Sequence, residues 1–240
     1  MGRTFSRSAI LALLLLPLCV AAQGELPKVL VLGDQVQRNL FSAVGKDLRD
    51  KVQIELPSVI ANDTGTALNK IDELLGDTKW DVIYFNYGLG DLFYKDPKST
   101  EIRAMSKYSG GVRVSSPEQY GKNLEQLAQR LKATGAKLIW ASTTPMVTVN
   151  AFPGYMGNMY DPNSEIEYNK IAASVMKRHG IPINDMHTFV LAQFGPEEKH
   201  PGHTGYQKHL SGFDRGKKRK DWNKQPMRKP IVEAILKQAL

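Results

Sequence analysis

Apolar runs alternate with amphipathic segments along most of this chain. Continuous apolar runs at "KVLVLG" (28–33) and "WDVIYFNYG" (80–88) are typical of strands that are buried on both faces of a sheet. Shorter runs predict three further strands, at "VQIEL" (52–56), "AKLIWAST" (136–143) and "IPIND" (181–185). The pattern therefore predicts five strands.

Helical segments separate these strands. The clearest is "SPEQYGKNLEQLAQRLKATG" (116–135), where Ser116 and Pro117 form a start signal and Gly135 a stop signal. Four more segments show helical signals: "QRNLFSAVGKDLRD" (37–50), "TALNKIDELLG" (66–76), "NSEIEYNKIAASVMKRHG" (163–180) and "PIVEAILKQAL" (230–240).

Strands that alternate with helices at this spacing build a parallel sheet that is covered on both faces. The sequence therefore predicts an α/β fold, a three-layer α/β/α sandwich with a five-stranded parallel sheet. We expect it to form one domain over residues 23–240, a length ample for one core. Ligands of such sheets bind at the carboxyl ends of the strands, and these loops are where a site is expected.

Residues 1–22 have the pattern of a secretory signal peptide. Arg3 and Arg7 precede the short apolar core "AILALLLLPL", and small residues place the cleavage after Ala22. The apolar core is too short to span a bilayer, so we expect an exported protein, periplasmic or extracellular, without a transmembrane segment. Cys19 is the single cysteine and leaves with this peptide, which excludes disulfides and a cysteine nucleophile from the mature chain.

The net charge of +8 is concentrated in one place. The basic segment 215–229, "RGKKRKDWNKQPMRK", carries eight basic residues and one acidic residue. In an exported protein, an anionic polysaccharide or envelope polymer is a better partner for it than nucleic acid. A solvated loop without a specific ligand is the alternative.

Two predicted strand ends and one later segment carry polar residues in a characteristic order. They are "LGDQ" (32–35), "FNYGLGDL" (85–92) and "EEKHPGHTGY" (197–206). Together they resemble the SGNH/GDSL hydrolase family, and the resemblance extends over nearly the whole mature chain, with exported bacterial members the most similar. It implies the flavodoxin-like fold of that family, and hydrolysis of O-acyl esters of a carbohydrate or envelope polymer.

The family attacks its ester with a serine that follows Gly-Asp, and a His, oriented by an acid three residues before it, activates that serine. Backbone N–H groups and an Asn side chain bind the oxyanion. Matched by position, this chain has Gln35 in place of the serine and Gly90 in place of the asparagine, with His200 as the histidine and Glu197 as the acid. Gly65 is the candidate for the oxyanion glycine. A primary amide cannot replace a hydroxyl nucleophile.

Two functions are therefore open besides a serine esterase. In the first, hydrolysis proceeds without the serine: His200 is the base, Glu197 orients it, and Asp34 or Asp91 provides a second carboxylate. Both aspartates could equally cap loop N–H groups. The second function is that of a pseudo-enzyme that binds a carbohydrate or polyanion without catalysis.

In either case four residues should line the pocket: Gln35, Asn86, Gly88 and Gly90. Five aromatic residues could stack on sugar rings or pack in the core and in the loop 151–163: Tyr84, Tyr87, Phe152, Tyr155 and Tyr160. That loop is rich in Gly, Pro and aromatic residues and could form a lid or pack as a plain loop.

A metal site is a third possibility. His200 and His203 stand three residues apart, with His187 or Asp185 as a possible further ligand. Pro201 and Gly202 lie between the two histidines and disfavour a helix that would bring their side chains together. We therefore expect neither a metal nor another cofactor.

Overall fold

A computed structural model describes residues 24–99, 103–145, 159–161, 163–194 and 227–240. Its main sheet has five parallel strands in the order β2-β1-β3-β6-β7. The strands are β1 (Lys28–Gly33), β2 (Gln53–Glu55), β3 (Val82–Asn86), β6 (Lys137–Ala141) and β7 (Ile183–Asn184). All five predicted strands and their parallel pairing are confirmed.

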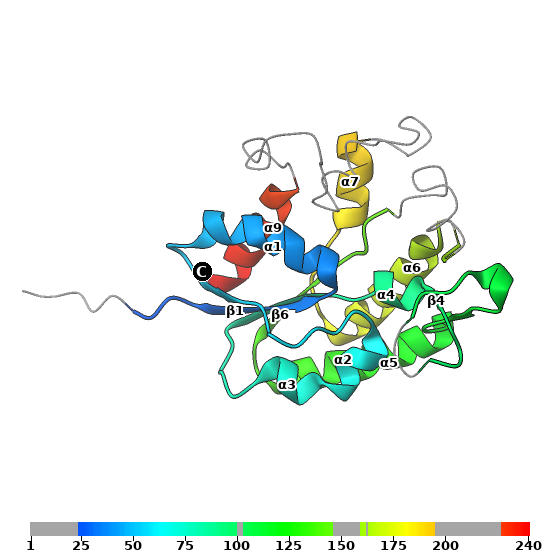
Figure 1. Cartoon of the computed structure of the whole chain (residues 1–240). Coiled ribbons are helices and arrows are strands. Elements are labelled where there is room, and N and C mark those ends of the chain that lie inside the picture. Colours follow the sequence, from blue (N-terminus) through cyan, green and yellow to red (C-terminus); the bar gives the residue numbers. More distant parts are fainter. Residues whose placement is uncertain (1–23, 100–102, 146–158, 162, 195–226) are drawn as a thin grey trace, which may run out of the picture.

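Helices cover both faces of this sheet (Figure 1). One face carries α1 (Gln35–Leu48), α7 (Met186–Phe194) and α9 (Arg228–Ala239). The other face carries α2 (Thr64–Asn69), α3 (Ile71–Leu75), α5 (Pro117–Ala133) and α6 (Ser164–His179). The predicted three-layer α/β/α fold is confirmed.

Two apolar clusters hold the layers together. Beneath α1 and α9, the sheet side chains Val29, Val31 and Ile139 pack against residues such as Phe41 and Ile231, all at most 5% exposed. The cluster on the other face is larger, and its aromatic members are Trp80, Phe85, Tyr87, Tyr120, Trp140, Tyr160 and Tyr168. Apolar side chains on both faces of each central strand explain why those strands are continuously apolar in sequence.

Three features differ from the sequence prediction. The helix expected over residues 66–76 is two short helices that meet at Lys70, whose φ of −112° and ψ of 15° are not helical. A small antiparallel pair, β4 (Tyr94–Lys95) and β5 (Val112–Arg113), follows β3 and encloses a 3₁₀ turn, Lys107–Ser109. Helix α7 was also not predicted, because "MHTFVLAQF" is apolar nearly all round and shows no helical period.

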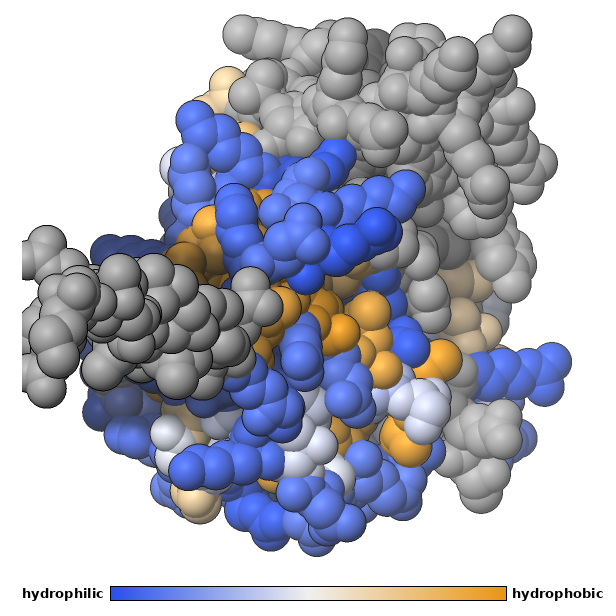
Figure 2. Space-filling model, turned by 90° about the vertical axis from the view of Figure 1, so that its left-hand side faces the viewer, coloured by the Kyte–Doolittle hydropathy of each residue, from blue (hydrophilic) through white to orange (hydrophobic). Residues whose placement is uncertain are grey.

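Seen from the amino ends of the strands, the molecule shows mostly hydrophilic residues around a central apolar band (Figure 2). The loops at the carboxyl ends lie on the opposite side, next to α4 (Leu89–Leu92) and β4 in Figure 1. Within the described residues, no helix is both long and apolar enough to cross a membrane.

Candidate functional site

The candidate site begins where β1 and β3 end side by side. Gly33 pairs with Asn86 at the carboxyl edge of the sheet. Gly33 has a φ of +154°, and a Cβ there would lie 2.7 Å from the backbone oxygen of Asn86. Both facts require glycine, so this residue allows the chain to turn sharply from β1 into α1.

Asp34 occupies the position that precedes α1. It is 6% exposed, and its Oδ1 accepts a hydrogen bond of 3.1 Å from the backbone N–H of Gln37. This contact is that of an N-cap residue and satisfies one of the free N–H groups at the start of the helix. Gln35 is the first residue of α1, directly after Asp34.

Asn86 connects the ends of β3 and β6. Its Nδ2 donates to the carbonyl of Ala141 at 2.7 Å and to Oγ1 of Thr143 at 3.3 Å. Asn86 and Asp34 lie in the wall of one small pocket, of about 20 Å³, which has room for about one water molecule. The described residues that line it are Asp34, Gln37, Leu40, Asn86, Leu89, Ser142, Thr143, Thr144, Met186 and Ile231.

The two glycines after β3 lie in tight backbone contacts. A Cβ on Gly88 would lie 2.3 Å from Oγ1 of Thr143. A Cβ on Gly90 would lie 1.9 Å from the backbone oxygen of Asn62 and 3.2 Å from the backbone nitrogen of Asp63. Position 90, which the sequence resemblance matches to the oxyanion asparagine of the family, therefore has no room for any side chain while the two loops keep this geometry.

Asp91 lies behind the edge and is completely buried. Its Oδ1 accepts hydrogen bonds from Thr64 Oγ1 at 2.5 Å and from Ser115 Oγ at 2.6 Å, and the Thr64 backbone N–H adds a contact of 3.1 Å to Oδ2. Burial raises the pKa of Asp91 to about 7, against the hydrogen bonds from Ser115 and Thr64, which lower it. These contacts join α4 to α2 and to the segment after β5, which is a structural role.

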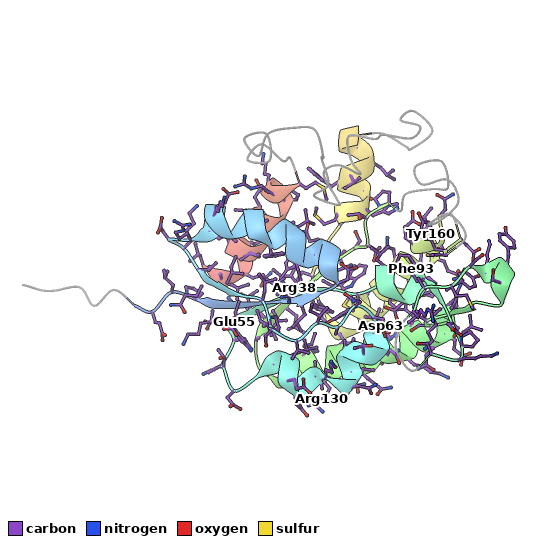
Figure 3. The ribbon with its side chains drawn as sticks, in the orientation of Figure 1. Arg38, Glu55, Asp63, Phe93, Arg130 and Tyr160 are labelled. Atoms are coloured by element: carbon purple, nitrogen blue, oxygen red, sulfur yellow. The ribbon has the colours of Figure 1, made fainter. Side chains whose placement is uncertain are left out.

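The loop that contains Asn62 leads into α2, whose N-cap is Asp63. Asp63 accepts hydrogen bonds from the backbone N–H of Thr66 at 2.9 Å and from its hydroxyl at 2.6 Å. Gly65 is the second residue of this short helix, and a Cβ there would lie 3.2 Å from Oδ1 of Asp63. Figure 3 labels Asp63 at the start of α2.

The structure thus divides the candidate residues into two groups. Asp34 and Asn86 share the pocket at the ends of β1 and β3, and Gly88 touches Thr143 of the same pocket. Gly65, Gly90 and Asp91 belong to the junction between α2 and α4. The Gln35 side chain, His200, Glu197 and residues 215–226 of the basic segment lie outside the described residues.

The aromatic residues proposed for sugar stacking are core residues wherever they are described. Tyr84 is 0%, Tyr87 1% and Tyr160 3% exposed, so none of the three presents a ring face to a ligand. Tyr160 packs edge to face on Phe93 with ring centroids 5.7 Å apart, and Figure 3 labels both residues. Phe152 and Tyr155 lie outside the described residues.

Several polar residues of the pocket wall and of the hydrogen bonds around Asp91 were not predicted from the sequence. Ser142 and Thr143 line the pocket, and their place directly after a strand was the signal that could have identified them. Thr64 and Ser115 give no such signal, since they reach Asp91 from distant parts of the chain. Among the described residues, no group of three or more His, Cys, Asp or Glu side chains could hold a metal ion.

This fold is shared with solved structures of SGNH/GDSL-type hydrolases. A lipase/acylhydrolase from Enterococcus faecalis superimposes with a TM-score of 0.59 at 16% identity, over 90% of this chain and 98% of its own. An acetyl xylan esterase gives a TM-score of 0.56 at 12% identity, over 89% and 100%. A GDSL-like lipase from Bacteroides thetaiotaomicron gives 0.56 at 13%, over 89% of each chain. Neither a family model nor a curated protein matches the sequence. The resemblance noted in the sequence is confirmed at the level of the fold.

Proposed function

We propose that this protein is an exported carbohydrate-binding protein with the SGNH-hydrolase fold, in which the machinery for serine ester hydrolysis has been replaced. The observation that carries the proposal is the contact between Gly90 and Asn62, because it closes the position of the oxyanion asparagine to any side chain. One donor of this kind contributes about 10²–10³ in kcat to a hydrolase. With Gln35 at the nucleophile position as well, two independent parts of the mechanism are missing.

Neither Asp34 nor Asp91 is placed to replace the missing serine nucleophile or the missing oxyanion asparagine. Asp34 caps α1, and Asp91 is fully buried among Thr64 and Ser115. A group with no exposed surface cannot meet a substrate, so Asp91 acts as a structural residue in this proposal. Asp34 lies in the wall of the small pocket.

A carbohydrate ligand is supported by the fold neighbours and by the pocket chemistry. One neighbour is described as an acetyl xylan esterase. The described pocket wall mixes carboxylate, amide and hydroxyl groups from Asp34, Asn86, Ser142 and Thr143, a set of donors and acceptors beside a space that admits one hydroxyl-sized group of a sugar.

The test is an aryl acetate assay of the purified mature protein beside Gln35→Ser, with a pull-down on acetylated and deacetylated xylan. We expect no hydrolysis above the buffer rate from either protein and retention on at least one polymer. Hydrolysis gained by Gln35→Ser would show that the oxyanion site still works without the asparagine, and would contradict the role given to Gly90.

A second candidate is an esterase that works without the serine, which the hydrolase fold favours. In it, His200 with Glu197 would activate water, and the water would attack the ester directly. Wild-type turnover that His200→Ala abolishes would establish this candidate and overturn the proposal of a pure binder.

A further inference from the structure

A larger cavity lies beside the small pocket, between α6 and the outer edge of β7. Its volume is about 290 Å³, at the lower end of the range of small-molecule sites, roughly 300–1,000 Å³. The described residues that line it are Trp140, Ser142, Ile166, Asn169, Lys170, Ala173, Ile183, Asp185, His187 and Thr188. Ser142 belongs to the walls of both spaces, so the cavity adjoins the edge that the fold uses for ligands.

One wall of this cavity contains a buried donor without an acceptor. Trp140 is 1% exposed, and among the described residues its indole Nε1–H has no hydrogen-bond partner. Because Trp140 Nε1 is buried, it does not itself meet a ligand in the cavity; the indole lies in the wall and reports on what occupies the space beside it.

A histidine on the same wall is backed by a buried carboxylate. His187 Nε2 lies 3.6 Å from Oε1 of Glu165, which is 2% exposed and whose Oε2 has no partner within the described part of the chain. At this distance the two atoms are not hydrogen-bonded, but the negative charge of the carboxylate favours a proton on Nε2, which leaves Nδ1 as an acceptor. No described residue makes a hydrogen bond to that Nδ1, whereas the His187 backbone N–H is held by Ser142 Oγ at 2.8 Å.

The remaining walls define what kind of ligand fits. Ile166 and Ile183 are 41% and 42% exposed at the rim, an unusual exposure for large aliphatic side chains, and they add apolar surface beside Trp140. Lys170 and Asp185 carry opposite charges, so the electrostatic potential of the lining favours neither a cation nor an anion strongly. A ligand that matches is neutral, has an apolar face, and carries groups that donate as well as accept.

We propose that this cavity binds one neutral sugar unit of a carbohydrate ligand, held by His187, backed by Glu165, as acceptor and packed on the aliphatic rim of Ile166 and Ile183. A ring hydroxyl is both a donor and an acceptor, and a pyranose presents apolar C–H groups that suit the aliphatic rim. The inference rests on the proposed carbohydrate function. It assigns a place to one sugar unit of the polysaccharide ligand, next to the pocket that contains Asn86.

The experiment is an NMR titration of the full-length mature protein with xylose, glucose, glucuronate and n-butanol. The reporters are the Trp140 indole N–H and the His187 ring signals. We expect saturable shifts of both reporters with xylose or glucose and weaker effects with glucuronate. Shifts with n-butanol alone, or tighter binding of glucuronate than of the neutral sugars, would overturn the assignment of a neutral sugar.

Two variants test the polar contacts. His187→Ala and Glu165→Gln should each weaken sugar binding by about tenfold, the loss expected for one good hydrogen bond. His179→Ala is the matched control: His179 lies at the other end of α6, pairs with Glu125 at 2.5 Å and does not line the cavity. Equal affinities in all three variants would overturn the roles of His187 and Glu165. If a variant fails to fold, the wild-type shifts still decide whether the cavity is occupied.

The outcomes also separate this inference from the proposed function. Xylan binding that leaves both reporters unmoved would overturn the cavity assignment and leave the proposed function intact. Saturable reporter shifts together with His200-dependent ester hydrolysis would support the cavity and overturn the non-catalytic proposal.

Discussion

Gly90 lies against the backbone carbonyl of Asn62 so closely that a Cβ at position 90 would be 1.9 Å from the carbonyl oxygen. The atoms nearest to this Cβ position are backbone atoms of Asn62 and Asp63, which cannot rotate away as the end of a flexible side chain can. The loop before α2 and the turn into α4 are therefore fitted to each other through a glycine. Restoring an asparagine at this position would require the two loops to separate.

Substitution of Gly90 should accordingly destabilise the protein. We expect Gly90→Ala and Gly90→Asn to lose about 1–3 kcal/mol or more in free energy of unfolding, the usual cost of overpacking. Urea denaturation measures the change. The control is Gly45→Ala in α1, where no atom lies within 4 Å of a built Cβ; it should gain about 0.5–1 kcal/mol from helix propensity. Equal stability of Gly90→Ala and wild type would disprove the close contact.

Asp91 should make stability fall as the pH rises from acid toward neutral. The unfolded state releases the proton near the ordinary pKa of 3.8, whereas the native carboxyl keeps it up to about 7. The stability that Asp91 contributes through its raised pKa is therefore fully present below about pH 4, declines between about pH 4 and pH 7, and does not change further above pH 7. At about 1.4 kcal/mol per pKa unit, the decline in the free energy of unfolding amounts to up to about 4 kcal/mol.

Unfolding free energies of wild type and Asp91→Asn, measured at intervals between pH 4 and 8, isolate this contribution. The amide keeps the size of the side chain and does not titrate, so the difference between the two proteins should change across this window. Two parallel pH profiles would mean that Asp91 is ionised in the native state at every pH tested.

Asp161 should anchor the β4–β5 segment to the start of α6. It accepts hydrogen bonds from Lys107 Nζ at 2.6 Å and Tyr94 OH at 2.8 Å, and pairs with Arg113. The Lys107 hydrogen bond is the main cause that holds the pKa of Asp161 well below its usual range, with Arg113 and Tyr94 adding to it against desolvation. A depressed pKa contributes stability above the unfolded pKa of about 3.8, and this stability is lost as the pH falls below it.

We therefore expect Asp161→Asn to cost about 1 kcal/mol at neutral pH, a modest value because the carboxylate is partly exposed. Hydrogen exchange should speed up in residues 94–113 more than in the main sheet. Glu118→Gln, which removes the exposed Lys122 pair on α5, is the control and should leave stability nearly unchanged. Equal exchange rates in both variants would contradict the anchoring role.

The basic segment 215–229 should give polymer binding a salt dependence that sugar binding lacks. Affinity for an anionic polysaccharide should fall as the salt concentration rises, because charged contacts are screened. Affinity for xylose in the α6–β7 cavity should stay nearly constant. Replacement of Lys217, Lys218 and Lys220 by Gln should reproduce the effect of high salt. A salt-independent affinity for the anionic polymer would show that this segment does not contact it.

The sequence predicts the sheet well because each strand and each helix start can be recognised from a short stretch of consecutive residues. Each central strand is a continuous apolar run, and Ser116 caps α5 as its Ser-Pro pattern indicates, accepting from Gln119 N–H at 3.1 Å. The break at Lys70 and the short β4–β5 pair carry no strong periodic signal, so they were not predicted.

The candidate site was predicted less completely, for a physical reason. Strand ends reveal Asp34 and Asn86 as neighbours because parallel strands end at one edge. The contact of Gly90 with Asn62, and that of His187 with Glu165, join residues that are more than twenty positions apart on separate elements. Such contacts depend on how the layers pack, and no spacing rule in one sequence predicts them.

Helix α9 also sets an order of events during synthesis. The described members of the apolar cluster beneath α5 and α6 have all been made once residue 181 is synthesised, since they lie between Leu30 and Ile181. The cluster on the opposite face needs Met227, Ile231 and Ile235, which pack with residues of α1 made far earlier. A growing chain can therefore cover one side of its sheet while the other side waits, with Phe41 and Val44 among the apolar side chains that stay without α9 until synthesis reaches it.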